Sequence, residues 1–333
     1  MVNVSVLRRS RSVSRPSAGP LAALVRSREA ILLVLIVCQI ILFSILFPIS
    51  FPNFNNFAAI LRNLAIDGTM AVGMMMMMVG GMFDLSIGGM LSMTGVVTGW
   101  LMKSAGLPVW AAILAGLSVA AVGGLMNGLF VAKVRVDPLI TTLGTMGIFR
   151  GIAVLLGGPG ISYLPDSFNR IGQSELLGIQ SPVWFMLIIA VLFAYLMSRT
   201  RFFRQYYYIG ANQKAAVLSG INVTRMQITG FSLMGLLAGL SGVLFASRLG
   251  TSVSIAGDGA ELRVITAVIL GGARLTGGSG TIWGALLGVA FIALISNVLI
   301  IARVSSYWQG MIVGLVLVLT VAMDRVFNRN VKE

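Results

Sequence analysis

The sequence has no histidine and a single cysteine, Cys38, which lies in an apolar stretch. A disulfide within the chain is therefore excluded. So are metal centres built from histidine and cysteine, a histidine general base and a cysteine–histidine nucleophile. The pattern is also unlike that of a disulfide-rich secreted domain. We expect this chain to carry no catalytic residues, to hold no metal and to bind no cofactor of its own.

Charged residues are scarce as well. They make up 10% of the 333 residues, against about 25% in a typical soluble domain. Hydrophobic residues make up 57%, and the mean hydropathy is +0.95. Such a chain has too few charges to cover the surface of a water-soluble globule. Its 40 glycines suit helices that approach closely in a bilayer. The composition predicts an all-α polytopic membrane protein.

About ten segments are apolar enough to cross a bilayer, which takes roughly 20 residues. The predicted spans are 31–48, 57–80, 84–102, 108–132, 137–156, 181–198, 224–246, 261–274, 281–301 and 307–325. The segment 261–274 is short and is predicted to be a half-helix or a re-entrant segment, shielded by protein or by a water-filled cavity. An even number of spans places both termini on the same side.

The basic residues predict which side that is, because lysine and arginine concentrate on the cytoplasmic side of membrane proteins. With the N-terminus in the cytoplasm, 17 of the 24 basic residues lie inside. The net charge of +14 is then a topology signal, and no nucleic-acid partner is expected. We predict a basic disordered tail over 1–30, a transmembrane domain over 31–325 and a cytoplasmic tail over 326–333. A transit peptide shares the first tail's composition, but no A-x-A cleavage pattern follows the first apolar run.

Two connections are longer and more polar than the others. The outer one, 157–180, combines Gly-Pro turns with charges of both signs, typical of a structured extracytoplasmic loop. It is either a connector or a docking surface for an external partner. The inner one, 199–223, begins with three arginines followed by Tyr206 to Tyr208, which are predicted to form an aromatic belt at the membrane surface.

The inner loop also predicts a short helix over 213–218. Gly210 is expected to break the preceding chain, Asn212 can cap the helix, and Gly220 can end it. Such a helix either packs into a groove of a partner protein or lies as a surface helix at the membrane. Its apolar residues are too few for membrane binding: Ala216, Val217 and Ile221.

Two glycine-rich segments resemble each other, 77–97 and 268–289. Each ends a span with Gly-Gly, passes a Leu-Ser or Leu-Thr pair, adds further glycines and starts another span. This predicts a parallel internal repeat, although glycine-rich membrane sequence also produces short matches by chance. In the second segment no Gly-Lys-Ser/Thr follows the glycines, so we do not expect nucleotide binding.

Polar residues within the spans are candidates for a translocation pathway or gate, because each is costly in lipid and should face the bundle interior. Asp84 either caps a helix or serves as a gate. Asn127 and Asn297 either join helices or bind a hydroxyl-rich solute. Arg62 and Asp67 could form an ion pair, and Asp137 is predicted to cap a helix that begins with proline. The candidate pathway residues are Asn63, Thr69, Asp84, Asn127, Thr141, Thr142 and Asn297.

Five consecutive methionines, Met74 to Met78, suggest soft-metal binding, since thioethers bind Cu(I). Consecutive residues point in all directions around a helix and cannot share one ion. Adaptable packing is the better interpretation.

The sequence resembles the permease subunit of bacterial ABC importers of the ribose/xylose/galactose class. The matching pieces are GMFDLSIGGMLSMTG at 81–95, KVRVDPLITTLGTMGIFRG at 133–151, IGANQKAAVLSGINV at 209–223 with the helix that follows, and AVILGGARLTGGSGTIWGALLG at 267–288. They occur in the family's order and cover nearly the whole chain beyond residue 30. One departure is Gln213, where relatives often have glutamate.

The resemblance implies partners and a mechanism. It implies cytoplasmic ATPases that hydrolyse ATP with Mg²⁺, a periplasmic sugar-binding protein, and a second permease copy or paralogue. The chain would lie in the bacterial inner membrane and carry a monosaccharide or related polyol by alternating access. The family's ATPase-coupling helix matches Gly210, Asn212, Ala215, Ala216, Ser219, Gly220 and Ile221.

Two other classes of protein were weighed. An ion-coupled secondary transporter would need carboxylates deep in its spans, and only Asp67 and Asp84 come near this requirement. A membrane enzyme would need an acid–base pair, which the residue types do not supply. The sequence separates neither the sugars from one another nor a homodimer from a heterodimer.

Overall fold

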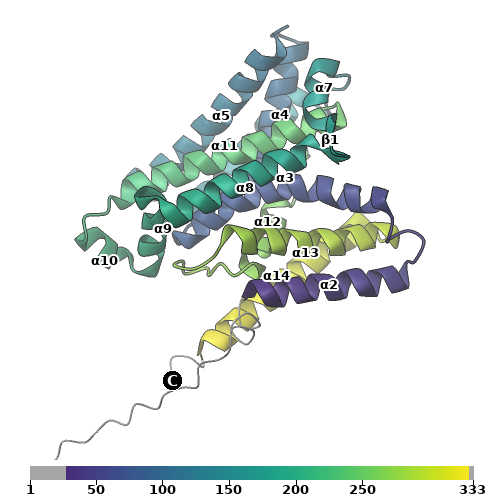
Figure 1. The fold of residues 1–333 in the computed structure, drawn as a ribbon. Helices are drawn as coiled ribbons and strands as arrows, with labels where there is room; N and C mark the ends of the chain where they lie inside the picture. Colours follow the sequence, from purple (N-terminus) through teal and green to yellow (C-terminus); the bar gives the residue numbers. More distant parts are fainter. Residues whose placement is uncertain (1–27, 330–333) are drawn as a thin grey trace, which may run out of the picture.

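The computed structural model describes residues 28–329 (Figure 1). Helices dominate this range. Its sheet is a small antiparallel hairpin of β1 (Glu175–Leu176) and β2 (Ile179–Gln180). The predicted helical class is therefore confirmed. Residues 1–27 of the predicted basic tail lie outside the described residues.

The helices follow one another with short connections, and a turn of π-helix, η1, extends α5. Their bounds are α2 Arg28–Leu46, α3 Phe54–Val79, α4 Ile87–Lys103, α5 Val109–Leu129, η1 Phe130–Val134, α6 Pro138–Gly157, α7 Asp166–Gln173, α8 Ser181–Arg199, α9 Arg201–Ala211, α10 Gln213–Leu218, α11 Val223–Leu249, α12 Ala260–Leu270, α13 Ile282–Ile301 and α14 Ser306–Arg329. The last helix therefore continues into the predicted tail 326–333.

Seven of the described helices are long and apolar enough to cross a membrane: α2, α3, α5 with η1, α6, α8, α11 and α13. The other three predicted spans coincide with shorter apolar helices. Helix α4 has 17 residues, α12 has 11, and the apolar part of α14 is Trp308–Leu319. The chain is thus a multi-pass membrane protein, and the count of ten crossings stays a prediction.

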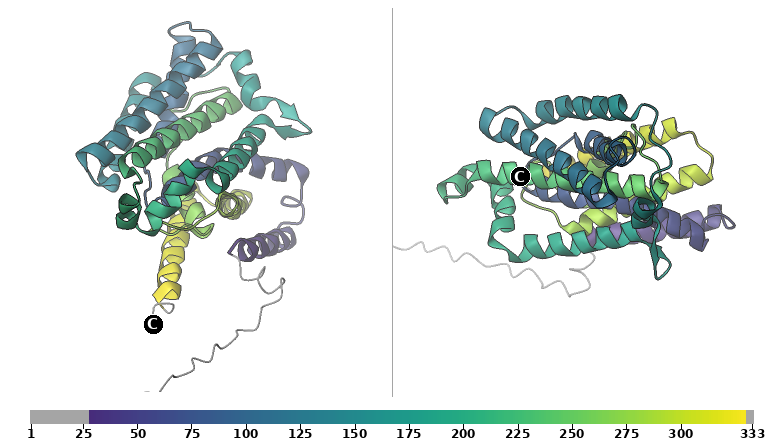
Figure 2. Two further views of the ribbon diagram at one scale, coloured as in Figure 1. Left: turned by 60° about the vertical axis from the view of Figure 1, so that its left-hand side comes forward. Right: turned by 90° about the horizontal axis from the view of Figure 1, so that it is seen from above.

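Helix α3 runs through the middle of the bundle, against α8, α11 and α13 (Figures 1 and 2). Met74 to Met78 are all at most 1% exposed, so this helix is enclosed on every side over that stretch. Unbranched thioether side chains can fill the irregular gaps between helices that cross at different angles. The packing interpretation of the methionines is confirmed.

Glycines bring α11 against α4 and α5. A Cβ on Gly124 would lie 2.3 Å from the backbone oxygen of Phe231, and one on Gly242 would lie 2.2 Å from that of Leu91. Any larger side chain would push these helices apart. Small residues at helix crossings are the usual way to obtain close packing in a bilayer.

The two glycine-rich segments end their first helices in the same manner. In α3, the N–H of Gly81 donates to the Met78 oxygen, and the N–H of Met82 donates to the Met77 oxygen. In α12, Gly272 and Ala273 make the matching pair of bonds to Ile269 and Val268. Both are Schellman motifs, with glycine at positive φ. This local match fits the predicted repeat, which itself stays a prediction.

Candidate coupling helix and polar cavity

Two ends of the bundle carry the candidate sites. Helices α9 and α10 lie at one end, and α7 with the β1–β2 hairpin lies at the other (Figures 1 and 2). Helix α11 runs between these ends, from the side of α10 to its contacts with α7.

The short helix predicted over 213–218 is present as α10, with the predicted caps. The side chain of Asn212 accepts a hydrogen bond from the Ala215 N–H at 3.0 Å. Beyond the helix, Gly220 has φ +81°, and its N–H donates to the Val217 oxygen. The N–H of Ile221 donates to the Ala216 oxygen, which completes a Schellman motif.

The prediction that Gly210 breaks the chain is wrong. Gly210 lies inside α9, a helix that the sequence reading missed. A Cβ at this position would lie 2.0 Å from the Val79 oxygen and 2.4 Å from the Gly278 nitrogen. Glycine is required here because three backbone segments meet, not because a helix ends.

The aromatic belt is also corrected. Tyr206 is fully buried, and its hydroxyl donates to the Met226 oxygen at 2.9 Å. The Tyr207 hydroxyl donates to the Gly280 oxygen at 2.9 Å. Burial raises the pKa of both phenols, so both remain donors. Of the three, Tyr208 is the exposed one. The tyrosines therefore anchor α9 to α11 and to the loop before α13.

The same place joins the two glycine-rich turns. The N–H of Gly278, in the α12–α13 loop, donates to the Val79 oxygen at the end of α3, at 2.8 Å. Since Gly210 of α9 packs on both residues, α9 meets the end of α3 and the loop before α13 at one place.

A groove of about 600 Å³ runs between α9 and α10. Its lining includes Asn212, Ala215, Ala216, Ser219 and Ile221, all predicted coupling residues. Beside the groove, Leu218 is 89% exposed and Val217 is 55% exposed. The sequence reading left these two side chains out of the coupling set. Their apolar character next to a capped, glycine-ended helix was the signal that could have found them.

Asp84 precedes α4 in a buried cluster. Its Oδ1 accepts from the Ser86 N–H at 2.7 Å and from the Ser86 hydroxyl at 2.6 Å. The Asn127 amide donates to the Ser86 hydroxyl oxygen at 2.9 Å. These bonds fit the helix-joining interpretation of Asn127. The N-cap of α4 is Ser86, without a side-chain cap bond, so Asp84 holds the turn before the helix and does not cap it. Asp137 does cap α6, accepting from the Leu139 N–H at 2.8 Å, with proline at the first position as predicted.

A polar cavity of about 210 Å³ lies toward the other end of the bundle, among α3, α11, α12, α13 and α14. We call it the polar cavity. Two predicted pathway residues, Asn63 and Asn297, line it. Its other polar lining residues are Asp67, Arg248, Arg263, Ser296 and Gln309. They come from distant parts of the sequence, and folding alone brings them together.

Asp67 does not pair with Arg62, which corrects the prediction. Its carboxylate forms an ion pair with Arg263 of α12, with one N–O distance of 3.1 Å and a second contact at 3.5 Å. This ion pair joins the middle of α3 to the start of α12. The short helix α12 is thereby placed against the bundle by charge as well as by packing.

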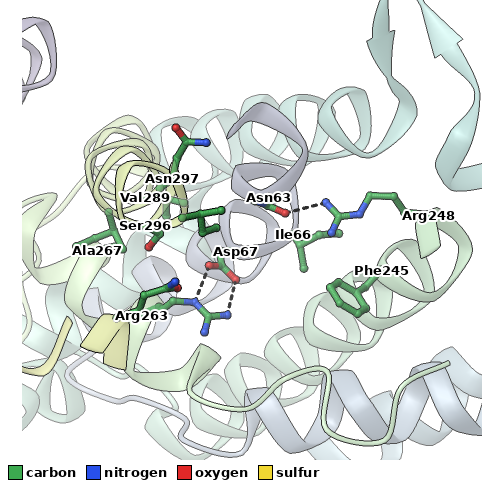
Figure 3. A pocket seen from close by; sticks show the side chains of 14 residues that line it. Asn63, Ile66, Asp67, Phe245, Arg248, Arg263, Ala267, Val289, Ser296 and Asn297 are labelled. Atoms are coloured by element: carbon green, nitrogen blue, oxygen red, sulfur yellow. Dashed lines mark hydrogen bonds and ion pairs between the residues drawn. The ribbon is translucent and has the colours of Figure 1, made fainter. Parts of the chain in front are cut away.

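Arg248 lies on the opposite side of the cavity. Its guanidinium donates to the Asn63 side-chain oxygen at 3.1 Å and lies over the Phe245 ring, 5.3 Å from the centroid. Figure 3 shows Arg248 and Arg263 reaching in from opposite sides, with Asn63 and Asp67 between them. Asn297 also exchanges hydrogen bonds with Asn56 of α3, at 2.7 and 3.2 Å.

The remaining predicted pathway residues lie away from this cavity. The Thr69 and Thr142 hydroxyls donate to carbonyls one turn back in their own helices, at 2.8 Å each. Thr141 lies in the first turn of α6. Asp84 and Asn127 belong to the cluster before α4. The structure therefore brings two of the seven candidates to the polar cavity and two others to the cluster before α4.

The loop 157–180 is structured, as expected. It contains α7 and the β1–β2 hairpin, and Ile161 forms a bridge with Ser252. Its tip exposes apolar side chains, with Leu177 84% exposed and Tyr163 88% exposed.

The sequence matches a family model over residues 56–321. The model is described as the permease component of the branched-chain amino acid transport system. The autoinducer 2 import system permease protein LsrC of Salmonella typhi is 36% identical over 299 residues, covering 90% of this chain and 86% of that protein.

Two ribose import permease proteins, both named RbsC, are also similar. That of Bacillus subtilis is 39% identical over 292 residues, covering 86% of this chain and 89% of the relative. That of Escherichia coli strain K12 is 37% identical over 299 residues, covering 87% of this chain and 92% of the relative. These matches extend over both candidate sites. The chain belongs to this family of permease components and is a membrane subunit of an ABC importer.

Proposed function

We propose that this chain forms the translocation pathway for a monosaccharide or a related polyol in the bacterial inner membrane. The support is the match to permeases named for ribose and autoinducer 2 import. A second permease copy or paralogue would complete the pathway. A periplasmic binding protein would deliver the solute, with the exposed tip of loop 157–180 as its contact surface.

We further propose that α10 lies on the cytoplasmic side, with ten crossings and both termini in the cytoplasm. The excess of basic residues predicted for that side supports this orientation. The polar cavity then lies in the outer half of the bundle, because it adjoins the end of α11 that contacts α7.

Coupling to ATP is proposed to act through α9 and α10. Cytoplasmic ATPases would bind ATP and Mg²⁺, receive Leu218 and Val217 in a groove, and move α10 as they close. Because Gly210 packs on Val79 and Gly278, this movement would reach α3 and the α12–α13 loop. The chain itself would be non-catalytic.

The observation that carries the proposal is Leu218, a large apolar side chain that is 89% exposed at the tip of a capped helix. An ion-coupled carrier would have no use for such a contact. Such a carrier would also need carboxylates that bind the coupling ion. The two candidates already have partners, because Asp84 accepts hydrogen bonds from Ser86 and Asp67 pairs with Arg263.

The test uses the same substitution at the two ends of the molecule. Leu218→Asp should abolish co-purification of the ATPase and ATP-dependent uptake into proteoliposomes, since a charge cannot enter an apolar groove without a partner. Leu177→Asp, at the tip of the β1–β2 hairpin, should leave the ATPase bound. Uptake that proceeds without ATP, or an ATPase that still binds the Leu218 variant, would contradict the proposal.

A further inference from the structure

The polar cavity contains more positive than negative charge. Two arginines, Arg248 and Arg263, line it together with one carboxylate, Asp67. Beyond the lining, Arg62 lies close enough for its charge to act on Arg248, while Glu261 and Asp258 act on Arg263. An excess of positive charge inside a membrane domain is costly, and this calls for an explanation.

The two lining arginines differ in how they are compensated. Arg263 has the Asp67 carboxylate, with contacts at 3.1 and 3.5 Å. Arg248 has neutral partners, the Asn63 amide oxygen and the Phe245 ring. Among residues 28–329, no carboxylate forms an ion pair with Arg248. A guanidinium has five N–H donors, so most of those of Arg248 remain available to a ligand.

The opposite wall offers groups of another kind. Ser296 and Gln309 present a hydroxyl and an amide, which can exchange hydrogen bonds with hydroxyls. Asn297 keeps one amide N–H beside its two hydrogen bonds with Asn56. Apolar side chains such as Ile66 and Val289 also line the cavity. The cavity therefore combines one available cation, several neutral hydrogen-bonding groups and apolar surface.

We propose that this cavity binds a polyhydroxylated solute that carries a carboxylate, such as a sugar acid. The carboxylate would bind Arg248, and the hydroxyls would face Ser296, Asn297 and Gln309. This inference rests on the proposed function and narrows its substrate class. With a neutral sugar, Arg248 would have no ion-pair partner of its own, because the Asp67 carboxylate that acts on it is already paired with Arg263.

The geometry favours a carboxylate over a phosphate. A phosphate group carries close to two negative charges at neutral pH and would need a second available cation, whereas Arg263 is already paired with Asp67. It also favours a solute over an acidic side chain of a docking protein, because both guanidiniums are half-buried and point into the cavity (Figure 3).

The test measures binding to the full chain in lipid nanodiscs by saturation-transfer NMR. The probes are two matched pairs: D-glucuronate with D-glucose, and D-galacturonate with D-galactose. A charge-assisted contact should make each acid bind about tenfold more tightly than its neutral partner. Added salt should reduce that difference.

Variants test whether the preference for the acids arises in the polar cavity. Arg248→Gln should remove the preference for the acids, and Arg248→Lys should keep part of it, because lysine retains the charge but not the bidentate geometry. Asp67→Asn should strengthen acid binding, since it releases Arg263. Arg170→Gln, on the exposed face of α7, should change nothing.

Acids that bind no better than neutral sugars, or not at all, would overturn the inference. So would an Arg248→Gln variant that keeps the acid preference, or one that loses binding-protein capture while solute binding is unchanged. ATPase co-purification and ATP-dependent uptake of a neutral sugar would meanwhile preserve the proposed function. The chain could also bind the acids through Arg248 and yet recruit no ATPase. That result would support the cavity assignment and contradict the proposed function.

Discussion

The α10 end and the polar-cavity end of the bundle are held together by different forces. At the α10 end, backbone segments touch directly: Gly210 of α9 packs on the Val79 oxygen and on Gly278. At the cavity end, backbone contact is joined by charge: Gly288 of α13 packs on the Ala267 oxygen, and the Asp67–Arg263 ion pair and the Arg248–Asn63 hydrogen bond join side chains around the cavity. The first end is therefore sensitive to volume, and the second to charge as well as to volume.

This difference suits the two roles that we propose. A contact that transmits movement must be stiff, and close-packed backbone has almost no free space to absorb a displacement. A contact that selects a solute must differ between transporters, and side chains can change without moving the helices that carry them.

Gly210→Ala should have the largest effect. Its Cβ would be placed 2.0 Å from a backbone oxygen, which cannot rotate away. We expect a loss of about 3 kcal/mol in stability, the upper part of the range for overpacked sites. Thermal unfolding of the purified chain measures it. The control is Gly144→Ala in α6, where a Cβ would meet nothing within 4 Å. Equal unfolding temperatures for the two variants would show that this end is not sterically restricted.

Asp84→Ala should come next. Asp84 is fully buried and accepts two hydrogen bonds from Ser86. The desolvation of this buried carboxylate offsets part of what its hydrogen bonds contribute, so its removal should cost about 2 kcal/mol in all. We expect a clear drop in the unfolding temperature and little change with Asp166→Ala, at the exposed start of α7. If Asp84→Ala instead stops transport in a fully stable protein, the gate interpretation is favoured over a role in holding this turn.

Asn212→Ala should have a smaller, local effect. Loss of an N-cap costs about 1 kcal/mol. Helix α10 has only six residues, so few other helical hydrogen bonds remain to hold it. Hydrogen exchange at the Ala215 amide should therefore speed up. The matched control is Asn222→Ala, which removes the same kind of cap from the 27-residue helix α11. If both helices fray equally, α10 is held by its surroundings and not by its cap.

The two ends also differ in how much of their structure the sequence alone predicts. The α10 helix was predicted with its caps, because Asn212 and Gly220 act within a few residues of each other. The polar cavity was not, because Asp67 and Arg263 are brought together only by the packing of α3 against α12. Reading along the chain offered the neighbouring Arg62 as the partner instead.

Predictions made from neighbouring residues were also wrong at two positions where the residue type is explained by contacts that are distant in the sequence. Gly210 was interpreted as a helix breaker and Tyr206 as a membrane-surface residue, which are the common reasons for those residue types. Both are explained by neighbours far away in sequence, namely Val79 and Gly278 for the glycine and Met226 for the tyrosine. Spans were easier to predict, because the length and hydropathy of a helix are properties of one segment.

The smallest effect should be the coupling between Asp67 and Arg263. A double-mutant cycle with Asp67→Asn, Arg263→Gln and the double variant isolates it. The side chains are 22% and 33% exposed, so solvent screens the pair, and we expect a coupling of about 0.5 to 1 kcal/mol. Asparagine has the shape of aspartate, and glutamine is a shorter, neutral and polar replacement for arginine, so the charge of the cavity should change more than the packing of the helices. A coupling as large as the Gly210→Ala effect would mean that charge also determines the packing of this end, and the division between a volume-sensitive and a charge-sensitive end would fail.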